Sequence, residues 1–450
     1  MKLSIFNVLE MILPAWQYNL APPKLVQDYW VNFDRLKPED RALIEEPSCY
    51  SCREVALLDM AFQAWQKGLI AKNGEALQIN AVRPNSRDEY RFARRYFNPV
   101  WSLFGLCVRL AEFHNPVSET AAFLSSFRAK RIDPYNKTKD WKSKLDGFHS
   151  ELLERQPRVS VIIPTLNRYL YLKDALADLE SQVYRNFEVL VVDQSDPFRD
   201  DFYSSVALNL KVIRQEEKAL WLARNTAIAK SEGEFVLLYD DDSRVGPDWI
   251  SSHIRCIDFF DADISSGVSI SAAGARVPET YSYYKWSDQI DTGNVMLRKQ
   301  VFREIGLFDR QFEKQRQGDG EFGLRAYLAG HSNISNPDAV RIHLKAGDGG
   351  LREMGSWDGW RPTNFLAPRP VPSVLYLTRK YFGNRAAVYQ ILQSVLPSFV
   401  PYRFKGNKIM MAVGSVLAIL LSPLIFVSVV RSWRLATTKL QEGASIPSLD

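Results

Sequence analysis

The chain has 450 residues, 46% of them hydrophobic and 24% charged, so it is long enough for two or three domains and has a globular composition. Its four cysteines are too few for a disulfide scaffold and favour a reducing compartment; Cys49-x-x-Cys52 lacks the second ligand pair of a zinc site. The net charge of +5 is the sum of an acidic body and a basic C-terminal region.

The N-terminal part, residues 1–135, is expected to be helical, with no role indicated by its residues. Glu10 and Pro14 interrupt the first apolar residues, so no signal peptide is expected. Apolar residues then recur at helical spacing, at positions 55, 58, 62, 65 and 69. Residues 136–157 are polar and lysine-rich and end in Gln156-Pro157, which is typical of a linker.

Residues 158–365 have the pattern of an α/β domain. Apolar runs at 159–163, 187–192, 211–213 and 234–239 predict strands, and the segments 172–183 and 219–230 predict helices between them. This order implies a Rossmann-like, mostly parallel sheet with right-handed crossovers. Ligands bind such sheets beyond the carboxyl ends of the strands, so the informative residues should follow the apolar runs.

Three consecutive aspartates, Asp240, Asp241 and Asp242, close the last of these runs and are called the acid block below. Like charges side by side at the end of a buried strand are costly unless a cation neutralises them. Carboxylate oxygens suit Mg²⁺ or Mn²⁺, which proteins usually share with substrate phosphates. The alternative is an acidic turn after a strand.

Polar residues follow the other predicted strands in the same position. Pro164, Thr165 and Arg168 come after the first strand and Asp193 after the second, where an acidic side chain can accept hydrogen bonds from a base or ribose. Arg224-Asn225 lies near the start of the second predicted helix. Each group taken alone is also consistent with loop chemistry or helix capping.

Together, the motifs from residue 159 to about 345 resemble those of the inverting family 2 glycosyltransferases, which have the GT-A fold. The matching segments follow the family's order and spacing: Val161–Arg168, Val191–Asp193, Ala223–Asn225, Gly233-Glu234, Leu238–Asp242, Thr292–Arg298, Ile305–Asp309, Asp319–Ala326 and Ala329–His331. The resemblance covers less than half of the chain.

The resemblance implies a role for individual residues. Asp240 and Asp242 would hold Mn²⁺ or Mg²⁺ on the diphosphate of a nucleotide sugar, and Asp319 would be the catalytic base. His343 stands where some members supply a further metal ligand, although a lone histidine on a strand is more often structural. The residues expected to bind substrate are Pro164, Thr165, Arg168, Asp193, Arg224, Asn225, Asp241, Gly293, Asn294 and Glu321.

Within this set, Asp193 would contact the base, and Pro164, Thr165 and Arg168 would line the nucleotide pocket. Glu321 is expected to orient substrate or to belong to the helix predicted at 322–328. Many members have Glu-Asp where this chain has Gly318-Asp319, so the acceptor contacts of the acidic neighbour are in doubt.

The expected activity is transfer of a sugar from a nucleotide sugar to a hydroxyl acceptor, in cell-surface polysaccharide or glycolipid synthesis. A divalent ion would stabilise the leaving diphosphate, and a carboxylate would take the hydroxyl proton. One alternative is a nucleotidyltransferase of related fold, although the glycine-rich basic loop of that class is absent after the first strand. The other is a non-catalytic module that binds nucleotide sugars.

The C-terminal region, residues 366–450, predicts membrane association. From Gly359 to Gln441 there is no acidic residue but there are eleven basic ones, which with the many apolar residues favours an anionic membrane surface over nucleic acid. Residues 409–430 form an uncharged run of 22, long enough to cross a bilayer. The predicted location is the membrane, with the catalytic domain on the cytoplasmic side and a saccharide or lipid-linked saccharide as acceptor.

Two features of this run conflict with a simple span. Basic residues flank both of its ends, and Ser422-Pro423 lies inside it. The sequence therefore leaves three arrangements open: a tilted span with a short exported tail, a re-entrant or interfacial helix pair with both ends cytoplasmic, and a buried helix pair of a soluble domain.

Overall fold

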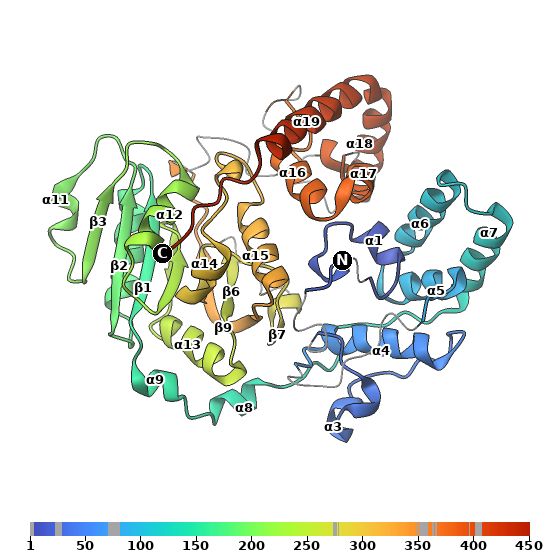
Figure 1. Ribbon diagram of the computed structural model, residues 1–450, viewed down its shortest axis with the longest axis horizontal. Coiled ribbons are helices and arrows are strands. Elements are labelled where there is room, and N and C mark those ends of the chain that lie inside the picture. The colour runs from blue at the N-terminus through green and yellow to red at the C-terminus, as the bar shows by residue number, and fades with distance from the viewer. Residues whose placement is uncertain are drawn as a thin grey trace. The chain divides into compact units, whose positions relative to one another are not determined.

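The computed structural model describes residues 4–22, 29–70, 82–272, 277, 279–347, 349–350, 359–361, 364, 367–395, 397–400 and 407–450. The chain divides into two compact units, coloured by residue number in Figure 1. We call Met1–Lys144, Ser282–Asp288 and Leu328–Gly330 the helical unit, and Leu145–Tyr281, Gln289–Tyr327 and His331–Asp450 the α/β unit.

Short helices around an aromatic core build the helical unit. The apolar spacing predicted from residue 55 onward corresponds to α4 (Arg53–Gln66), whose residues from Val55 to Trp65 are buried except for Leu57. Asparagine side chains cap the next three helices, and a proline follows the cap in α6 and α7. The other elements of this unit are α1 (Val8–Ile12), η1 (Gln17–Asn19), η2 (Phe33–Arg35), α3 (Pro38–Arg41), α5 (Ser86–Tyr96), α6 (Pro99–Ala111), α7 (Pro116–Ser125), η4 (Ser126–Arg128) and β7 (Lys285–Trp286).

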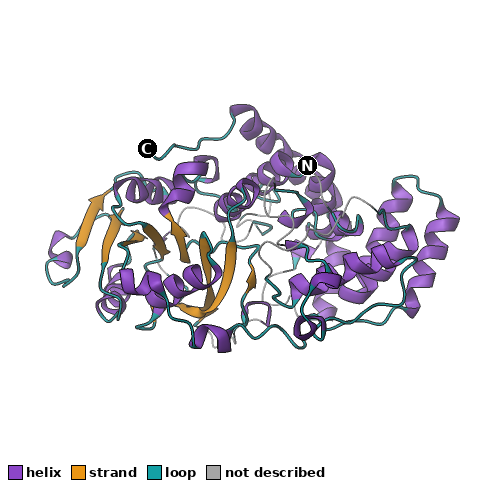
Figure 2. Cartoon of the chain, turned by 60° about the horizontal axis from the view of Figure 1, so that its bottom comes forward, coloured by secondary structure: helices purple, strands orange, loops and turns teal. Residues whose placement is uncertain are grey.

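A mixed sheet forms the centre of the α/β unit, and Figure 2 shows its strands side by side. Its strands follow one another in the order β3 (Leu210–Arg214), β2 (Phe187–Asp193), β1 (Val159–Thr165), β4 (Phe235–Tyr239), β8 (Asn294–Arg298), β6 (Ile264–Ser271), β9 (Asn333–His343) and β5 (Ser243–Val245). The first four are parallel, as predicted. The rest of the sheet is mixed: β8 pairs antiparallel with both β4 and β6, β6 pairs parallel with β9, and β5 pairs antiparallel with β9.

Helices cover both faces of the sheet. Alternate residues of β1, β2 and β4 pack with α10 (Tyr169–Glu180) and α13 (Trp249–Phe260) in one core, while α12 (Leu220–Lys230) contacts β1 and β2. Strand residues buried on both sides explain the nearly continuous apolar runs in the sequence. The remaining elements before residue 345 are α9 (Glu151–Arg155), α11 (Asp200–Tyr203), η5 (Glu279–Tyr281), α14 (Lys299–Ile305), η6 (Arg310–Phe312) and α15 (Gly318–Ala329).

The segment predicted as a linker, residues 136–157, is partly helical. It contains α8 (Lys142–Asp146) and α9, and the boundary between the two units falls between Lys144 and Leu145. Ser150 caps α9 and also donates a hydrogen bond to Asp258 of α13, at 2.6 Å. The second half of the segment is therefore attached to the α/β unit.

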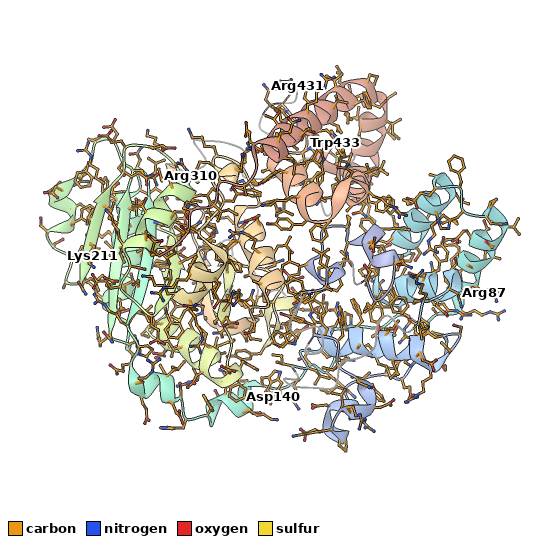
Figure 3. The ribbon with its side chains drawn as sticks, viewed as in Figure 1. Arg87, Asp140, Lys211, Arg310, Arg431 and Trp433 are labelled. Atoms are coloured by element: carbon orange, nitrogen blue, oxygen red, sulfur yellow. The ribbon has the colours of Figure 1, made fainter. Side chains whose placement is uncertain are left out.

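The C-terminal region is a group of helices within the α/β unit. They are α16 (Pro372–Tyr381), α17 (Gly383–Ser394), η8 (Pro397–Phe399), α18 (Lys408–Leu420) and α19 (Ser422–Glu442). Arg379 of α16 lies 4.2 Å from the ring centroid of Trp433 of α19; Trp433 is labelled in Figure 3. Among the described residues no single helix is long and apolar enough to cross a bilayer, but α18 and α19 together are, with a bend of 81° between them.

Candidate active site

The acid block lies where the chain leaves β4 and turns into β5. Because β5 pairs with β9, placing Ser243 opposite His343 and Val245 opposite Arg341, the end of β9 comes to the acid block. Residues 341 and 343 are two apart on one strand, so their side chains point to the same face of the sheet. The fold thus adds basic side chains from β9 to carboxylates about 100 residues earlier.

Two arginines bind the first carboxylate of the block. Arg224 of α12 donates to Oδ1 of Asp240 at 2.8 Å, and Arg341 donates to Oδ2 at 2.7 Å. Both arginines are 2% exposed. Burial raises the pKa of Asp240, but the two guanidinium groups outweigh burial and lower this pKa to about 2. Asp240 is therefore ionised and is neutralised by the protein's own cations.

Arg341 also connects this pair to the loop before β8. Its guanidinium donates to Asp291 at 3.0 Å and to the hydroxyl of Ser269 at 2.9 Å. A Cβ atom at Gly293 would lie 1.7 Å from Nη1 of Arg341 and 2.3 Å from Oδ2 of Asp240. Only glycine at position 293 lets the backbone approach this ion pair so closely.

The other two carboxylates share Arg168. Asp241 accepts from Thr165 Oγ1 at 2.8 Å and from Arg168 Nη1 at 3.2 Å, and the same nitrogen lies 3.3 Å from Asp242. Burial raises the pKa of Asp241 to about 7, against the attraction of Arg168. Burial also acts to raise the pKa of Asp242, but its contact with His343 reverses this and the pKa is lowered.

Asp319 stands near the N-terminus of α15 and is half-buried. Its Oδ1 accepts the backbone N–H of Gly320 at 2.8 Å. Burial raises its pKa, Asp291 adds to this, and Gly320 and Arg224 oppose it. Because Asp291 and Arg224 are also partners of the Asp240 cluster, Asp319 belongs to the same site.

The glycine before Asp319 has a steric cause. A Cβ atom at Gly318 would lie 2.4 Å from Cζ2 of Trp221, whose ring is nearly buried and whose Nε1 donates to the carbonyl of Phe312 at 3.1 Å. The indole of Trp221 therefore occupies the space that a side chain at position 318 would need.

Three residues predicted to bind substrate are instead engaged within the protein. Asn225 exchanges two hydrogen bonds with the backbone of Phe308, both 2.9 Å. The Asn294 amide donates to the carbonyls of Val268 and Ala339. The carboxylate of Glu321 is fully buried and contacts Arg325 on α15 and both Lys380 and Tyr381 on α16. The structure does not bring these three side chains to the acid block.

The two residues predicted to meet the nucleotide at the ends of β1 and β2 are also buried. Asp193 accepts from the hydroxyls of Tyr169 and Tyr203, both at 2.7 Å, and from the N–H of Ser195 at 2.9 Å. Pro164 lies inside β1, opposite Val192 of β2. Asp193 thus fixes the loop after β2, and its two oxygens already have partners.

The donor atoms next to the acid block fit a divalent cation in chemical type. Nε2 of His343 lies 3.3 Å from Oδ1 of Asp242, and imidazole and carboxylate together suit Mn²⁺. No cluster of three such ligands is assembled in the part of the chain that the structure describes. Both oxygens of Asp240 face arginines, so guanidinium groups of the protein supply the cations that neutralise this carboxylate.

Sequence reasoning missed Arg341 and Asp291. Arg341 stands two residues before His343 in a predicted strand, so the period of two placed it on the same face as His343. Asp291 directly precedes the Thr292-Gly293 motif. Each signal was present, but nothing in the sequence paired either residue with Asp240.

Residues 160–308 match Glycosyl transferase family 2, so this part of the chain is a family 2 glycosyltransferase domain.

Curated relatives agree with this assignment. The chain is 29% identical to a putative glycosyltransferase, EpsH, of Bacillus subtilis (strain 168), over 22% of this chain and 30% of that protein. It is 30% identical to glycosyltransferase GlyA of Streptococcus pneumoniae serotype 4, over 38% of this chain and 27% of that protein. The chain thus spans less than a third of the length of these two relatives.

A third relative has a solved structure. The chain is 32% identical to the poly(ribitol-phosphate) beta-N-acetylglucosaminyltransferase TarS of Staphylococcus aureus (strain Mu50), over 27% of this chain and 23% of that protein. The crystal structure of S. aureus TarS 1–349 in complex with UDP-GlcNAc aligns with a TM-score of 0.39 at 23% identity, covering 63% of this chain and 85% of that one.

Proposed function

We propose that the chain is a metal-dependent, inverting glycosyltransferase that moves a sugar from a nucleotide sugar to a hydroxyl acceptor. One observation carries the proposal: the acid block and Asp319, 77 or more residues apart in the sequence, share Arg224 as a charged partner at one end of the sheet. An ion-binding carboxylate and a separate carboxylate base are the two groups that this reaction needs.

Different residues of the site would hold the ion, stabilise the leaving group and accept the proton. Asp242, His343 and Asp240 would hold the divalent ion, which supplies positive charge to the leaving diphosphate. Arg224 and Arg341 add two buried positive charges where negative charge grows on phosphate oxygen. Asp319 would take the proton of the attacking hydroxyl, and its raised pKa makes it a stronger base than an ordinary aspartate.

The acceptor class is the least constrained part of the proposal. A cell-surface polysaccharide or a glycolipid is supported by the relative named for poly(ribitol-phosphate), which is 32% identical over the matched segment. A saccharide or lipid-linked saccharide would then offer the hydroxyl. The nucleotidyltransferase alternative is not retained, because residues 160–308 match the glycosyltransferase family.

A donor panel tests the reaction. The purified chain is incubated with individual UDP-, GDP-, dTDP- and CMP-sugars and Mn²⁺ or Mg²⁺, and slow donor hydrolysis is measured with and without EDTA. We expect hydrolysis of one donor class that EDTA abolishes and added Mn²⁺ restores. Full activity in EDTA would overturn metal dependence, and release of a nucleoside monophosphate plus a sugar 1-phosphate from a nucleoside-diphosphate sugar would overturn sugar transfer.

Substitution of the base separates catalysis from binding. Asp319→Asn removes the proton acceptor but retains the side chain's shape, so transfer should fall by about 100-fold or more while donor binding, measured by thermal stabilisation, is retained. The control is Asp200→Asn on α11, an exposed aspartate of the same unit. Normal turnover of Asp319→Asn would identify a different base or a non-catalytic binding module.

We also propose that the catalytic unit binds the cytoplasmic face of a membrane through the bend between α18 and α19. The apolar side chains around the bend are well exposed, with Leu420 at 72% and Phe426 at 69%. The tail that follows α19 is hydrogen-bonded to the rest of the α/β unit. The backbone N–H of Leu307 donates to the carbonyl of Pro447 at 2.8 Å, and the N–H of Arg310 donates to the carbonyl of Ser445 at 2.9 Å. A tail held in this way favours the interfacial pair over a span with an exported end.

Vesicle flotation tests this surface. The wild-type chain should float with vesicles that contain phosphatidylglycerol, and Leu420→Glu combined with Phe426→Glu should leave most of it in the soluble fraction. Val183→Glu, which changes a 62% exposed valine elsewhere in the unit, is the matched control. Unchanged flotation of the double variant would refute this membrane surface.

A further inference from the structure

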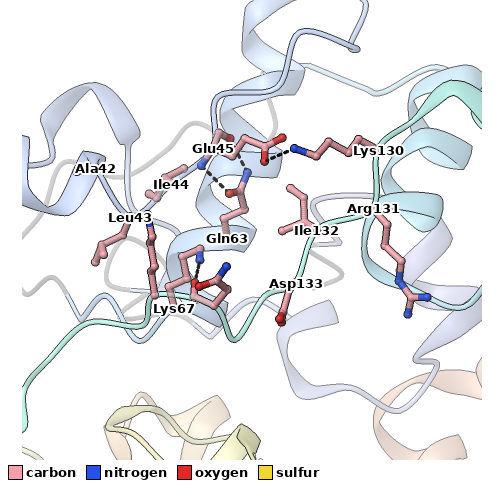
Figure 4. Close-up of a pocket in the computed structure, with 12 residues that line it drawn as sticks. Ala42, Leu43, Ile44, Glu45, Gln63, Lys67, Lys130, Arg131, Ile132 and Asp133 are labelled. Carbon is pink, nitrogen blue, oxygen red and sulfur yellow. Dashed lines mark hydrogen bonds and ion pairs between the residues drawn. The ribbon is translucent and has the colours of Figure 1, made fainter.

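A cavity of about 360 Å³ lies within the helical unit, at the C-terminal end of α4 (Figure 4). Its walls come from residues 42–45, from Gln63 and Lys67, and from the segment 130–137. Four cationic side chains line it against two carboxylates: Lys67, Lys130, Arg131 and Lys137 against Glu45 and Asp133. The volume is within the range of small-ligand sites, and the charge favours an anion.

Lys67 is the unusual member of this lining, because it is 5% exposed. Its Nζ donates to the backbone carbonyl of Asn136, and no carboxylate lies within ion-pair distance of it among the described residues. Burial lowers its pKa, Asp133 opposes this, and Lys137 adds to it. A buried ammonium group with one neutral partner is costly, and an anion in the cavity would relieve that cost.

Nearby carboxylates favour the charged form of Lys67, but among the described residues none lies within ion-pair distance of it, and both have other partners. Glu45 lies 3.8 Å from Arg95 and 3.9 Å from Lys130, as Figure 4 shows for the lysine. Asp133 accepts the backbone N–H of Tyr135 at 3.0 Å. Positive charge is therefore in excess around the cavity.

The wall beside Lys67 is held in place by a hydrogen-bond network. Gln63 accepts from the N–H of Glu45 at 2.9 Å and donates to the carbonyl of the same residue at 2.8 Å. It also donates to Asp59, which pairs with Arg95 at 3.0 Å. Because Gln63, Asp59 and Arg95 are buried and hydrogen-bonded in series, this wall is formed before any ligand enters, which reduces the entropy lost on binding.

We propose that this cavity is a binding site for a phosphate group, with Lys67 as the interior contact and Lys130, Arg131 and Lys137 at its mouth. The site lies outside the family 2 domain at residues 160–308, so it does not depend on the reaction proposed above. The phosphate could belong to a soluble phosphorylated saccharide or to a lipid headgroup, because the cavity presents the same donors to either.

Calorimetric titration with inorganic pyrophosphate tests the site in the full chain. Lys67→Met should weaken pyrophosphate binding at the cavity by about 10-fold or more, because it removes the buried charge that contacts the ligand. Arg87→Ala changes an exposed cation on α5 that does not line the cavity and should leave binding unchanged (Figure 3). Donor hydrolysis should be the same in all three proteins, which separates this site from the acid block.

A second variant and a second ligand complete the test. Lys130→Ala with Lys137→Ala changes exposed side chains, so folding is retained, and binding should weaken by a few-fold. Vesicles with and without phosphatidylglycerol distinguish the sources: loss of vesicle binding in Lys67→Met assigns the site to a headgroup, and loss of pyrophosphate binding alone assigns it to a soluble phosphate. Binding of both probes at wild-type strength by Lys67→Met would overturn the proposal.

Discussion

Each unit buries an aspartate against arginine, but the two sites differ in what surrounds them. In the helical unit, fully buried Asp59 accepts hydrogen bonds from Tyr50, Gln63, Arg95 and Tyr96, at 2.5 to 3.0 Å. In the α/β unit, the Asp240 side chain is 29% exposed, and both of its partners are arginines. The first network is closed to solvent, and the second is open on one side.

This difference separates a structural role from a functional one. All partners of Asp59 are protein groups within a core, so the network can contribute to folding, and no ligand can reach the fully buried carboxylate of Asp59 itself. Asp240 keeps one face toward solvent beside two guanidinium groups, a geometry that allows a phosphate to compete with the carboxylate for the arginines. Substitutions in the two networks should therefore have different consequences.

Breaking the closed network should have the largest effect. Asp59→Ala leaves Arg95 buried without its carboxylate, and this should lower the free energy of unfolding by about 3–5 kcal/mol. Urea unfolding measures the change, and the exposed Asp34→Ala on η2 is the control. A change as small as that of the control would show that the network is not stabilising.

Removing an arginine from the open network should mainly affect catalysis. Arg341→Met leaves Asp240 and Asp291 without a shared cation, so the pKa of Asp240 should rise from about 2 and donor hydrolysis should fall by about 10-fold or more. The acidic limb of the pH–rate profile should shift to higher pH. Arg303→Met, an exposed arginine on α14, is the control. An unmoved acidic limb would contradict a role of Arg341 through Asp240.

A smaller change at the same place has only a steric effect. Gly293→Ala introduces a methyl group where Nη1 of Arg341 and Oδ2 of Asp240 lie, so it should separate that pair and cost about 1–3 kcal/mol of donor binding or stability. Gly246→Ala, which has open space around it, should be silent. Thermal shifts with and without donor measure both variants, and wild-type donor binding by Gly293→Ala would contradict the close packing.

Sequence reasoning predicted the local elements of the α/β unit well. The run predicted at 234–239 corresponds to β4, and the helix predicted at 219–230 corresponds to α12, because both patterns depend on neighbours in the chain. The pairing of β8 between β4 and β6 was not predictable, since antiparallel pairing of distant strands leaves no periodic signal. The same limit applies to Arg341, which meets Asp240 across 101 positions.

The helical unit shows a second limit of prediction from sequence, the choice of side-chain partners. Arg91, Arg94 and Arg95 lie close together in α5, where the residue types alone favour a solvated basic face over an anion-binding one. Arg95 is instead buried on Asp59, and Arg94 lies over the ring of Phe127, 4.3 Å from its centroid. Partners of this kind depend on helix packing, which residue types alone do not determine.

The smallest expected effect is a difference in pH dependence between the two units. Burial raises the pKa of Glu89, in the helical unit, from 4.5 to about 7, although Arg109 and two backbone N–H groups of α1 oppose it. The folded unit therefore keeps a proton that the unfolded chain releases above about pH 4.5, so stability should fall as pH rises to about 7. For Asp240, whose pKa is lowered, stability is lost only as pH falls from 3.8 toward about 2.

Glu89→Gln tests this difference directly, because the amide cannot titrate. Between about pH 5 and pH 8 the wild-type free energy of unfolding should fall by roughly 1–3 kcal/mol, and the variant should show a flatter dependence. Glu151→Gln on α9, an exposed carboxylate, should retain the wild-type slope. An equal slope in Glu89→Gln would mean that another group titrates in this pH range and would contradict the assignment to Glu89.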